Sequence, residues 1–385
     1  MIAIDEALAR LIALAPPIAR EEAPLARAAG RWLADDVMAL RTQPAHDLSA
    51  MDGYALRFAD LDASLTVIGE SAAGRPFPGR VEPGQAVRIF TGAAVPAGAD
   101  TVLVQEEAAI DGTVLRLAGE GPGRAGRHIR RAGLDFHAGD TIVRTGERIG
   151  AARIGLAALA GLATLPVRRP VRVALFGTGD EIGAGPDALP DSNTPMLAAA
   201  LRDLPVEIVA RAVLPDDLHA IAAALGDTPA DLIVTTGGAS VGDHDLVRPA
   251  IEAAGGRIDF WKIAMRPGKP MLAGRIGDAM IVGLPGNPVA AFVTTHRFVR
   301  PLLAAMSGGS LALSPRRLPL GAPLPANDRR ADHLRGVIRD DRVFPAPTQD
   351  SSMLATLAAS DCLILRAPFA PTAPAGESVE ILDLA

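Results

Sequence analysis

The sequence reads VRVALFGTGDEI over residues 171–182, DLIVTTGGASVGDHD over 231–245 and AMIVGLPGNPVAAF over 279–292. Each stretch opens with a continuous apolar run and ends in glycine and polar residues, and amphipathic segments lie between the stretches. Continuous apolar strands alternating with helices are typical of a largely parallel sheet that is covered on both faces. We therefore predict a doubly wound α/β domain over 167–305.

Residues 1–166 are predicted to form a helical layer that carries an inserted β domain. Apolar residues recur at helical spacing over 4–12, a second helix is expected over Ala23–Leu33, and GAARIGLAALAGL predicts a third at 150–162. Between about 43 and 144, short apolar runs alternate with Gly and Pro turns, which indicates a small β-rich unit.

The chain beyond the α/β domain changes pattern again. After the SGGS break at 307–310, short strands with many prolines predict a separate, barrel-like β unit over 306–385. The fold class expected is therefore multidomain α/β plus β, with a helical and β-rich region first and a β unit last. A length of 385 residues is consistent with several structural units.

Composition excludes several classes of protein. The formal net charge is -6 with both signs interspersed, so nucleic acid and anionic membranes are not expected partners. A single cysteine, Cys362, excludes an intramolecular disulfide framework and a cysteine-rich metal site. The first residues lack the pattern of a signal peptide, and no apolar run is long enough for a transmembrane helix, so a cytoplasmic protein is expected.

The first two strand-end loops carry the residues expected to do chemistry. Ligands of open parallel sheets bind beyond the carboxyl ends of the strands. Asp180 and Glu181 follow the first strand and suit Mg²⁺ or proton transfer, although an ordinary solvated loop has the same composition. The second loop offers hydroxyls and backbone N–H groups to an anion, and Asp243 and Asp245 follow it, as they would at a helix N-terminus. Neither a Walker A loop nor a dinucleotide fingerprint is present.

The third region pairs two stiff Pro-Gly loops, MRPGKP at 265–270 and GLPGNP at 283–288. Arg266 and Lys269 of the first loop are candidate donors to an oxyanion. In the predicted β-rich unit, the motif SAMDGYAL places Asp52 in a turn and the motif IFTGAAVP contains Thr91. Each motif taken alone could be an ordinary hairpin turn. No GxSxG nucleophile elbow occurs in the sequence.

Taken in order, these motifs resemble the MoeA family, which is related to the molybdenum cofactor domain of gephyrin. The resemblance rests on SAMDGYAL, IFTGAAVP, FGTGDEI, the DSN at 191–193, TTGGASVGDHD, MRPGKP and GLPGNPVAAF. It implies an elongated homodimer that inserts molybdenum from molybdate into adenylylated molybdopterin with release of AMP. It also implies Mg²⁺ as cofactor, and it leaves open whether a molybdopterin adenylyltransferase is the partner that delivers the pterin. Preference for molybdenum over tungsten stays open.

The resemblance also implies roles for individual residues. It implies that four residues are catalytic: Glu181, Asp52, Asp245 and Lys269. It also implies that Glu181 and Asp245 are metal ligands. Substrate binding falls to Thr91, Asp135, Ser192, Asn193, Asp216, Thr236, Gly237, Gly238, Ser240, Arg266, Pro285, Pro288 and Ser351.

The sequence departs from the family pattern at two places. Arg266 stands where the family commonly has Lys, and Leu134 and Phe136 flank Asp135 where a GED-I pattern is usual. Two alternatives to the transferase remain: another pyrophosphate-cleaving enzyme on the same fold, and a scaffold resembling the clustering role of gephyrin.

Overall fold

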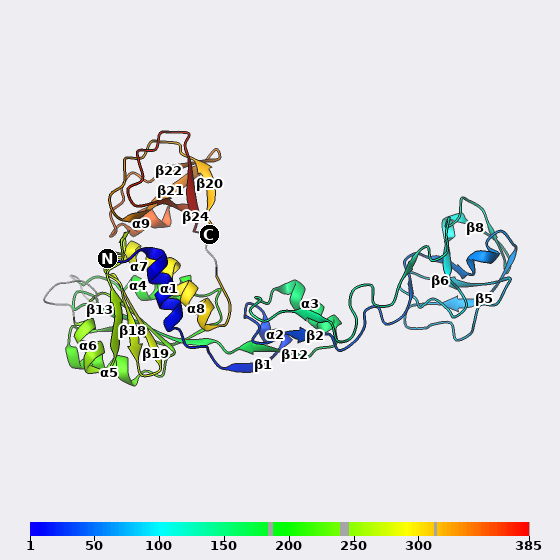
Figure 1. Ribbon diagram of the computed structural model, residues 1–385, viewed down its shortest axis with the longest axis horizontal. Coiled ribbons are helices and arrows are strands. Elements are labelled where there is room, and N and C mark those ends of the chain that lie inside the picture. The colour runs from blue at the N-terminus through cyan, green and yellow to red at the C-terminus, as the bar shows by residue number, and fades with distance from the viewer. Residues whose placement is uncertain (184–187, 239–245, 312–313, 385) are drawn as a thin grey trace.

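The molecule is elongated, with compact units at its two ends and a narrow stalk between them (Figure 1). The computed structural model describes residues 1–183, 188–238, 246–311 and 314–384. An α/β unit and the C-terminal β unit lie together at one end, and a β unit built from the first third of the chain lies at the other. Among the described residues, no helix is long and apolar enough to cross a membrane.

The α/β unit is built on a six-stranded sheet with the order β14-β13-β15-β19-β18-β16. The first four strands are parallel, and the last two continue the sheet in antiparallel pairing. The strands are β13 (Val171–Thr178), β14 (Val206–Leu214), β15 (Leu232–Thr236), β16 (Arg257–Trp261), β18 (Leu272–Ile276) and β19 (Ala279–Leu284). Its helices are α4 (Asn193–Ala200), α5 (Leu218–Asp227), α6 (Val247–Ala253), α7 (Pro288–Thr294), the π-helix η3 (Thr295–Val299) and α8 (Arg300–Met306).

Apolar side chains on both faces of each central strand explain why this sheet is buried. In β13, Val173 and Leu175 join the core that contains α4, α7 and α8. Ala174 and Phe176, which point to the other face, join the core beneath α5 and α6. The predicted doubly wound fold is therefore confirmed.

The first helix, α1 (Ile4–Leu14), packs on this α/β unit rather than on the stalk that follows it. Its buried residues Ile4, Ala7 and Leu11 belong to the same core as Leu302 of α8. A helix with one apolar face is stable only against a large apolar surface. The α/β sheet provides that surface, so the opening helix lies outside the layer expected for residues 1–166.

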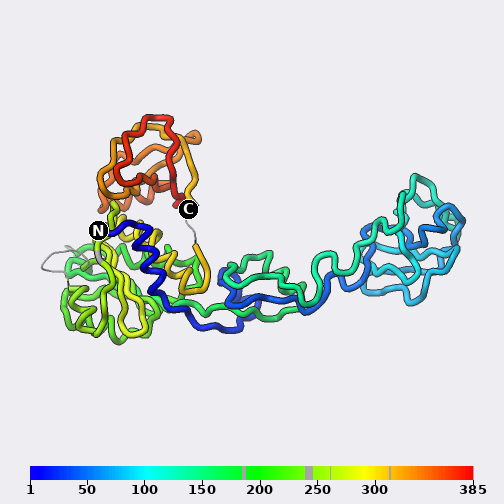
Figure 2. The backbone as a smooth tube through the Cα atoms, viewed as in Figure 1, coloured from blue at the N-terminus to red at the C-terminus, as the bar shows by residue number. Residues whose placement is uncertain are grey.

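The stalk is formed by two segments that run in opposite directions, one leaving the α/β unit and one returning (Figure 2). Antiparallel pairs join them, β1 with β12 and β2 with β11. The elements are β1 (Arg20–Pro24), α2 (Leu25–Ala28), β2 (Val37–Met38), β11 (Thr141–Val143), α3 (Ala151–Leu159) and β12 (Thr164–Arg168).

The helix predicted over Ala23–Leu33 is wrong, because only the four residues of α2 are helical there. Ala23 pairs with Leu165 in the sheet, and Gly30 has a φ of 80° that ends the helical turn. Pairing across the stalk overrides the local helical preference of this alanine-rich segment. The single helical layer expected here is thus replaced by two small sheets with two short helices.

The distal β unit contains a six-stranded sheet with the order β7-β4-β6-β5-β9-β8. A Cβ at Gly53, the first residue of β4, would collide with the Leu103 carbonyl, so the neighbouring strand requires glycine at this position. The elements are β3 (Leu48–Ser49), β4 (Gly53–Leu56), η1 (Phe58–Asp60), β5 (Leu65–Ser71), β6 (Gln85–Ile89), β7 (Thr101–Val104), η2 (Gln105–Glu107), β8 (Ala108–Asp111), β9 (Val114–Leu117) and β10 (Ile129–Arg130).

The C-terminal unit is a small barrel, as its short strands predict. Its sheet has the order β17-β21-β23-β24-β20, β22 also pairs with β21, and a bridge between Leu320 and Val343 brings the two edges together. β17 (Met265–Arg266) comes from the α/β unit, between β16 and β18, and adds to the edge of this sheet. The other elements are β20 (Arg316–Pro319), β21 (Ala331–Arg339), β22 (Arg342–Pro345), α9 (Leu354–Ala358), β23 (Cys362–Arg366) and β24 (Ser378–Asp383). Burial raises the pKa of the Cys362 thiol to about 12, as expected of a structural cysteine rather than a nucleophile.

Asp231 secures the start of β15 to the chain entering β13. Its carboxylate accepts hydrogen bonds from the guanidinium groups of Arg169, at 2.6 and 2.8 Å, and of Arg172, at 3.0 Å. Burial alone would raise the pKa of Asp231, but the hydrogen bonds from Arg169 and Arg172 outweigh it and hold the pKa well below its ordinary value. The ionised carboxylate therefore stabilises the folded state.

We predict that Asp231→Asn lowers the free energy of unfolding at pH 7 by about 2–3 kcal/mol, because two arginines lose their buried charged partner. The contribution is complete above the ordinary carboxyl pKa of about 4 and is lost as pH falls toward the lowered folded-state value. Urea denaturation at pH 7 and pH 3 measures the difference between wild type and variant. The difference in the free energy of unfolding should be smaller at pH 3 than at pH 7. As a control, Asp227→Asn at an exposed position should leave the free energy of unfolding unchanged at both pH values.

Candidate functional site

A cavity of about 940 Å³ opens at the carboxyl ends of β13, β15 and β19. This is the edge at which a doubly wound sheet binds its ligands. Nine of the residues carried over from the family resemblance line it: Glu181, Ser192, Asn193, Asp216, Thr236, Gly237, Gly238, Pro285 and Pro288. The structure thus brings together residues from four separate segments of the chain.

Glycines allow the loops that line the cavity to pack closely against each other. Gly237 has a φ of 91°, and a Cβ there would lie 2.6 Å from the Thr178 carbonyl oxygen. A Cβ at Gly286 would lie 3.3 Å from the Gly237 Cα. Glycine at both positions therefore lets the backbones of the two loops approach each other beside the cavity.

Two buried polar atoms at the cavity find no hydrogen-bond partner within the part of the chain that the structure describes. They are Asn193 Oδ1 and Thr236 Oγ1. The amide of Asn193 is held in place, because its Nδ2 donates to the Gly286 carbonyl oxygen at 2.7 Å. Buried polar groups are normally paired, so both atoms fit a ligand that offers hydrogen bonds.

Carboxylates gather at one side of the cavity. The Asp216 backbone amide donates to Asp180 Oδ1 at 2.9 Å, and the Asp180 amide donates to Asp216 Oδ2 at 3.3 Å. Glu181 follows directly, and a Cβ at Gly179 would collide with its carboxylate, so glycine there leaves room for that side chain. Oxygen donors of this kind suit a hard divalent cation.

No cluster of three or more metal-binding side chains occurs in the residues that the structure describes. Three predicted or candidate residues, Ser240, Asp243 and Asp245, lie outside the described residues. The assignment of Glu181 and Asp245 as metal ligands therefore stays a prediction.

A second cavity, of about 390 Å³, adjoins the first and shares Pro270, Pro285 and Asn287 with it. We call it the cationic cavity, because three cationic side chains line it, those of Arg266, Lys269 and Arg330, against a single carboxylate, that of Asp350. Ser351 of the C-terminal unit lies in its wall, and its hydroxyl accepts a hydrogen bond of 2.8 Å from Asn287 Nδ2.

Arg330 is a residue that the sequence analysis missed. Arg330 directly precedes β21, and the residues around it match none of the sequence motifs described above. The two consecutive arginines, Arg329 and Arg330, were the only feature of the sequence that could have suggested an anion-binding residue here. Arg330 lines the same cavity as Lys269 only because the C-terminal unit docks on the α/β unit.

Arg266 borders the cationic cavity, but its guanidinium is bonded to the C-terminal unit. Its Nε donates to Asp332 Oδ1 at 2.8 Å, and its Nη2 donates to Asp332 Oδ2. The bond to Asp332 raises the pKa of Arg266. The predicted role as an oxyanion donor is thus not supported by the direction of its hydrogen bonds.

Asp52 and Thr91 lie in the distal β unit, away from the two cavities (Figure 1). Asp52 Oδ1 accepts hydrogen bonds from the Thr91 amide at 2.7 Å and from its hydroxyl at 2.8 Å. These bonds lower the pKa of Asp52. Asp135 lines a separate hollow of about 340 Å³ with Gln43 and Leu134. One chain alone therefore does not unite these three predicted residues with Glu181.

These features define the class: a multi-unit α/β protein whose polar, glycine-walled cavity lies beside a cationic one. Family models agree: "MoeA N-terminal region (domain I and II)" matches residues 2–161, "Probable molybdopterin binding domain" matches 174–305, and "MoeA C-terminal region (domain IV)" matches 317–384.

Similar proteins give the same result. The molybdopterin molybdenumtransferase of Haemophilus influenzae is 37% identical over 80% of this chain and 78% of its own length. That of Synechococcus elongatus is 34% identical over 99% of this chain and 98% of its own length. A crystal structure of the molybdopterin biosynthesis MoeA protein of Pyrococcus horikoshii covers all of both chains, with a TM-score of 0.86 and 25% identity. The chain belongs to the MoeA family.

We predict that Thr91→Val raises the pKa of Asp52 toward its ordinary value, because one of the two hydrogen bonds to the carboxylate is lost while the backbone bond remains. A carboxyl-carbon NMR titration of labelled aspartate measures the shift. Thr113→Val, in an exposed turn of the same unit, is the matched control. An unchanged Asp52 titration would contradict the role of the hydroxyl.

Proposed function

We propose that this protein transfers molybdenum from molybdate to adenylylated molybdopterin and releases AMP. The observation that carries the proposal is the pair of adjoining cavities, one polar and glycine-walled and the other cationic. A large ligand and a small oxyanion could occupy them side by side. The names of the similar proteins, molybdopterin molybdenumtransferase, support the same activity.

The larger cavity suits the pterin and its pyrophosphate. Asn193 Oδ1 and Thr236 Oγ1, which have no partner among the described residues, would accept hydrogen bonds from ring N–H groups. A ligand of this size fills a volume of about 940 Å³ better than molybdate alone would.

The cationic cavity suits molybdate. Lys269 and Arg330 supply positive charge, and the Ser351 hydroxyl adds a polar contact. Charge-assisted hydrogen bonds to oxyanions are among the strongest that side chains make. The two cavities share Pro285 and Asn287, which supports binding of molybdate next to the pterin.

The carboxylate of Glu181 is an oxygen donor of the kind that suits Mg²⁺. Glu181 would hold the ion at the first cavity together with Asp245, which lies outside the described residues. When bound, the ion would neutralise the negative charge of the pyrophosphate. In the hydrolysis, water attacks a phosphorus of the pyrophosphate, the P–O–P bond breaks and AMP leaves. We assign Glu181 as acceptor of the proton that water loses.

The first test is Glu181→Gln, which keeps the size of the side chain and removes its charge. We expect AMP release to fall by roughly 10²–10⁴, the usual range for acid–base help. Released AMP is measured chromatographically after mixing enzyme, Mg²⁺, molybdate and adenylylated molybdopterin. Affinity for the pterin and the melting temperature should stay near wild type, because Glu181 lies in a loop.

The matched control is Glu207→Gln, an exposed residue on β14 at the other end of the sheet. Near-normal AMP release from Glu181→Gln would overturn the role of Glu181. A wild type that cleaves other dinucleotides equally well would favour the alternative hydrolase, and no turnover of any substrate would favour a scaffold.

We further propose that the protein acts as a homodimer whose sites are completed across subunits. Asp52 and Thr91 lie at the far end of the molecule from Glu181, so a second copy would have to supply them (Figure 1). Three large apolar residues of the stalk region are exposed: Met38 at 50%, Leu40 at 67% and Leu134 at 66%. Exposed apolar surface of this kind is typical of an interface.

Mixing two inactive variants tests the shared site. A dimer of Asp52→Asn with Glu181→Gln contains one site with both native residues, so random pairing should restore about a quarter of wild-type activity. Each variant alone should stay inactive, and light scattering should give about twice the chain mass of 39.7 kDa. A persistent monomer, or no recovery on mixing, would contradict the proposal.

A further inference from the structure

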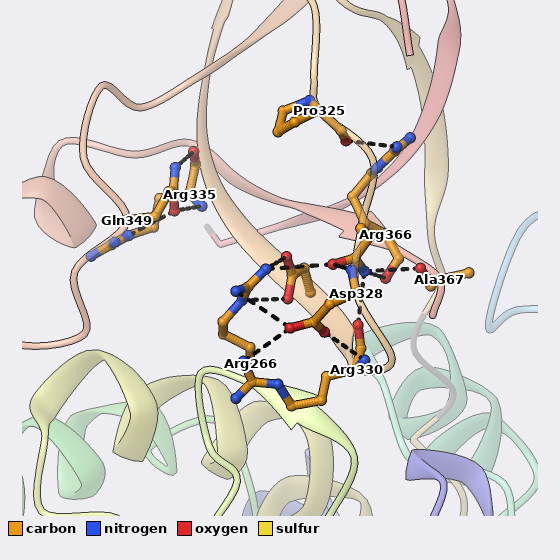
Figure 3. Close-up of polar contacts among 10 residues, drawn as sticks. Arg266, Pro325, Asp328, Arg330, Arg335, Gln349, Arg366 and Ala367 are labelled. Atoms are coloured by element: carbon orange, nitrogen blue, oxygen red, sulfur yellow. Dashed lines mark hydrogen bonds and ion pairs between the residues drawn. The ribbon is translucent and has the colours of Figure 1, made fainter. Parts of the chain in front are cut away.

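A chain of alternating charges links the α/β unit to the C-terminal unit beside the cationic cavity (Figure 3). It runs from Asp332 through Arg266 and Asp328 to Arg330. Arg266 Nη1 lies 3.8 Å from Asp328 Oδ2, and Arg330 Nη2 donates to the same oxygen at 3.2 Å. One carboxylate thus contacts two guanidinium groups from different units of the fold.

Asp332, at the buried end of this series of charged side chains, holds Arg266 in a fixed position. The Asp332 side chain is only 6% exposed and accepts from both Nε and Nη2 of Arg266. The backbones are joined as well, because β17 pairs in parallel with β21 and the Ala331 amide donates to the Ala264 carbonyl oxygen at 3.0 Å. Arg266 therefore has a defined position relative to the segment that carries Arg330.

Arg330, at the other end of this series of charged side chains, lies at the cationic cavity. Arg330 lines it with Lys269 and Ser351, and its side chain is 26% exposed. Asp328 also holds the backbone of this segment, since its Oδ1 accepts from the Arg330 amide at 2.8 Å. Hydrogen bonds from the Arg330 backbone and side chain lower the pKa of Asp328, so its carboxylate is ionised at neutral pH.

An ionised carboxylate beside a site for a divalent oxyanion needs an explanation, because like charges repel. Asp328 would weaken oxyanion binding by its charge alone. Its two contacts with Arg330, a residue that lines the cavity, offer a compensating effect. One holds the Arg330 backbone amide and the other restricts its guanidinium.

We propose that Arg266 is a positioning residue that holds Asp328 and, through it, Arg330 in place for the oxyanion, rather than a ligand of the oxyanion itself. This inference rests on the proposed function of the cationic cavity. It also accounts for arginine at a position where the family resemblance leads one to expect lysine. Only a planar guanidinium can contact Asp332 through two nitrogens while a third faces Asp328.

Asp328→Ala distinguishes positioning from direct binding by the sign of its effect. If Arg266 bound the oxyanion directly, removing a nearby negative charge would strengthen binding. If Asp328 positions Arg330, its removal should weaken molybdate binding by roughly three- to tenfold, the scale of a partly exposed charged contact. Molybdate affinity is measured by isothermal titration calorimetry on the full-length protein at fixed ionic strength.

The matched control is Asp383→Ala in the same unit. Asp383 forms an ion pair of 2.8 Å with Arg316, away from the residues that line the cavity, and should leave molybdate affinity unchanged. Arg266→Lys keeps the charge but loses the paired contact, so it should also weaken molybdate binding. Affinity for adenylylated molybdopterin should stay near wild type in all three variants, and the melting temperature should stay near wild type in Asp328→Ala and Asp383→Ala. Arg266→Lys is expected to lower the melting temperature as well, because the buried Asp332 carboxylate loses one of its two contacts.

The outcomes separate the two proposals. A wild type that binds no molybdate would overturn the proposed function and the inference that rests on it. A wild type that binds molybdate, together with an Asp328→Ala variant that binds equally or more tightly, would overturn the positioning role of Arg266 alone. Weaker binding by both Asp328→Ala and Arg266→Lys, with an unchanged Asp383→Ala, would support it.

Discussion

Burial of the central sheet on both faces is the constraint on which the rest of the structure depends. Strands β13, β15 and β19 run parallel between two apolar cores, so their backbone groups are paired and most of their side chains are apolar. The polar groups of the site therefore lie at the last residues of the strands, such as Thr236, and in the loops that follow, where Glu181 and Pro285 line one cavity. Glycine at 237 and 286 allows those loops to approach each other closely.

Docking of the C-terminal barrel adds what the sheet alone lacks. Leu357, Leu363 and Leu382 of the barrel belong to the same apolar core as α7 and α8, so the barrel has a fixed place on the α/β unit. That contact brings Arg330 and Ser351 to Lys269. A chain with a net charge of -6 thereby gathers positive charge at one small cavity, and local placement rather than total charge sets what the cavity attracts.

Local sequence preference was a poor guide in the stalk. The segment Ala23–Leu33 is rich in alanine and predicts a helix, yet β1 takes its first residues into a pair with β12. Helix propensity differs by fractions of a kcal/mol between ordinary residues, whereas strand pairing and burial of Leu33 act together across the stalk. The same reasoning explains α1, whose apolar face packs on the sheet that follows much later in the chain.

The sequence by itself determined the doubly wound fold, the barrel and nine of the residues that line the larger cavity. Apolar periodicity reports burial directly, and strand-end loops of a parallel sheet converge whatever their neighbours are. Tertiary structure alone decided that Arg266 contacts Asp332, 66 residues away, that Arg330 reaches the cationic cavity, and that Asp52 lies at the far end of the molecule. Those contacts depend on how whole units dock, and no local pattern of residues records which surfaces meet.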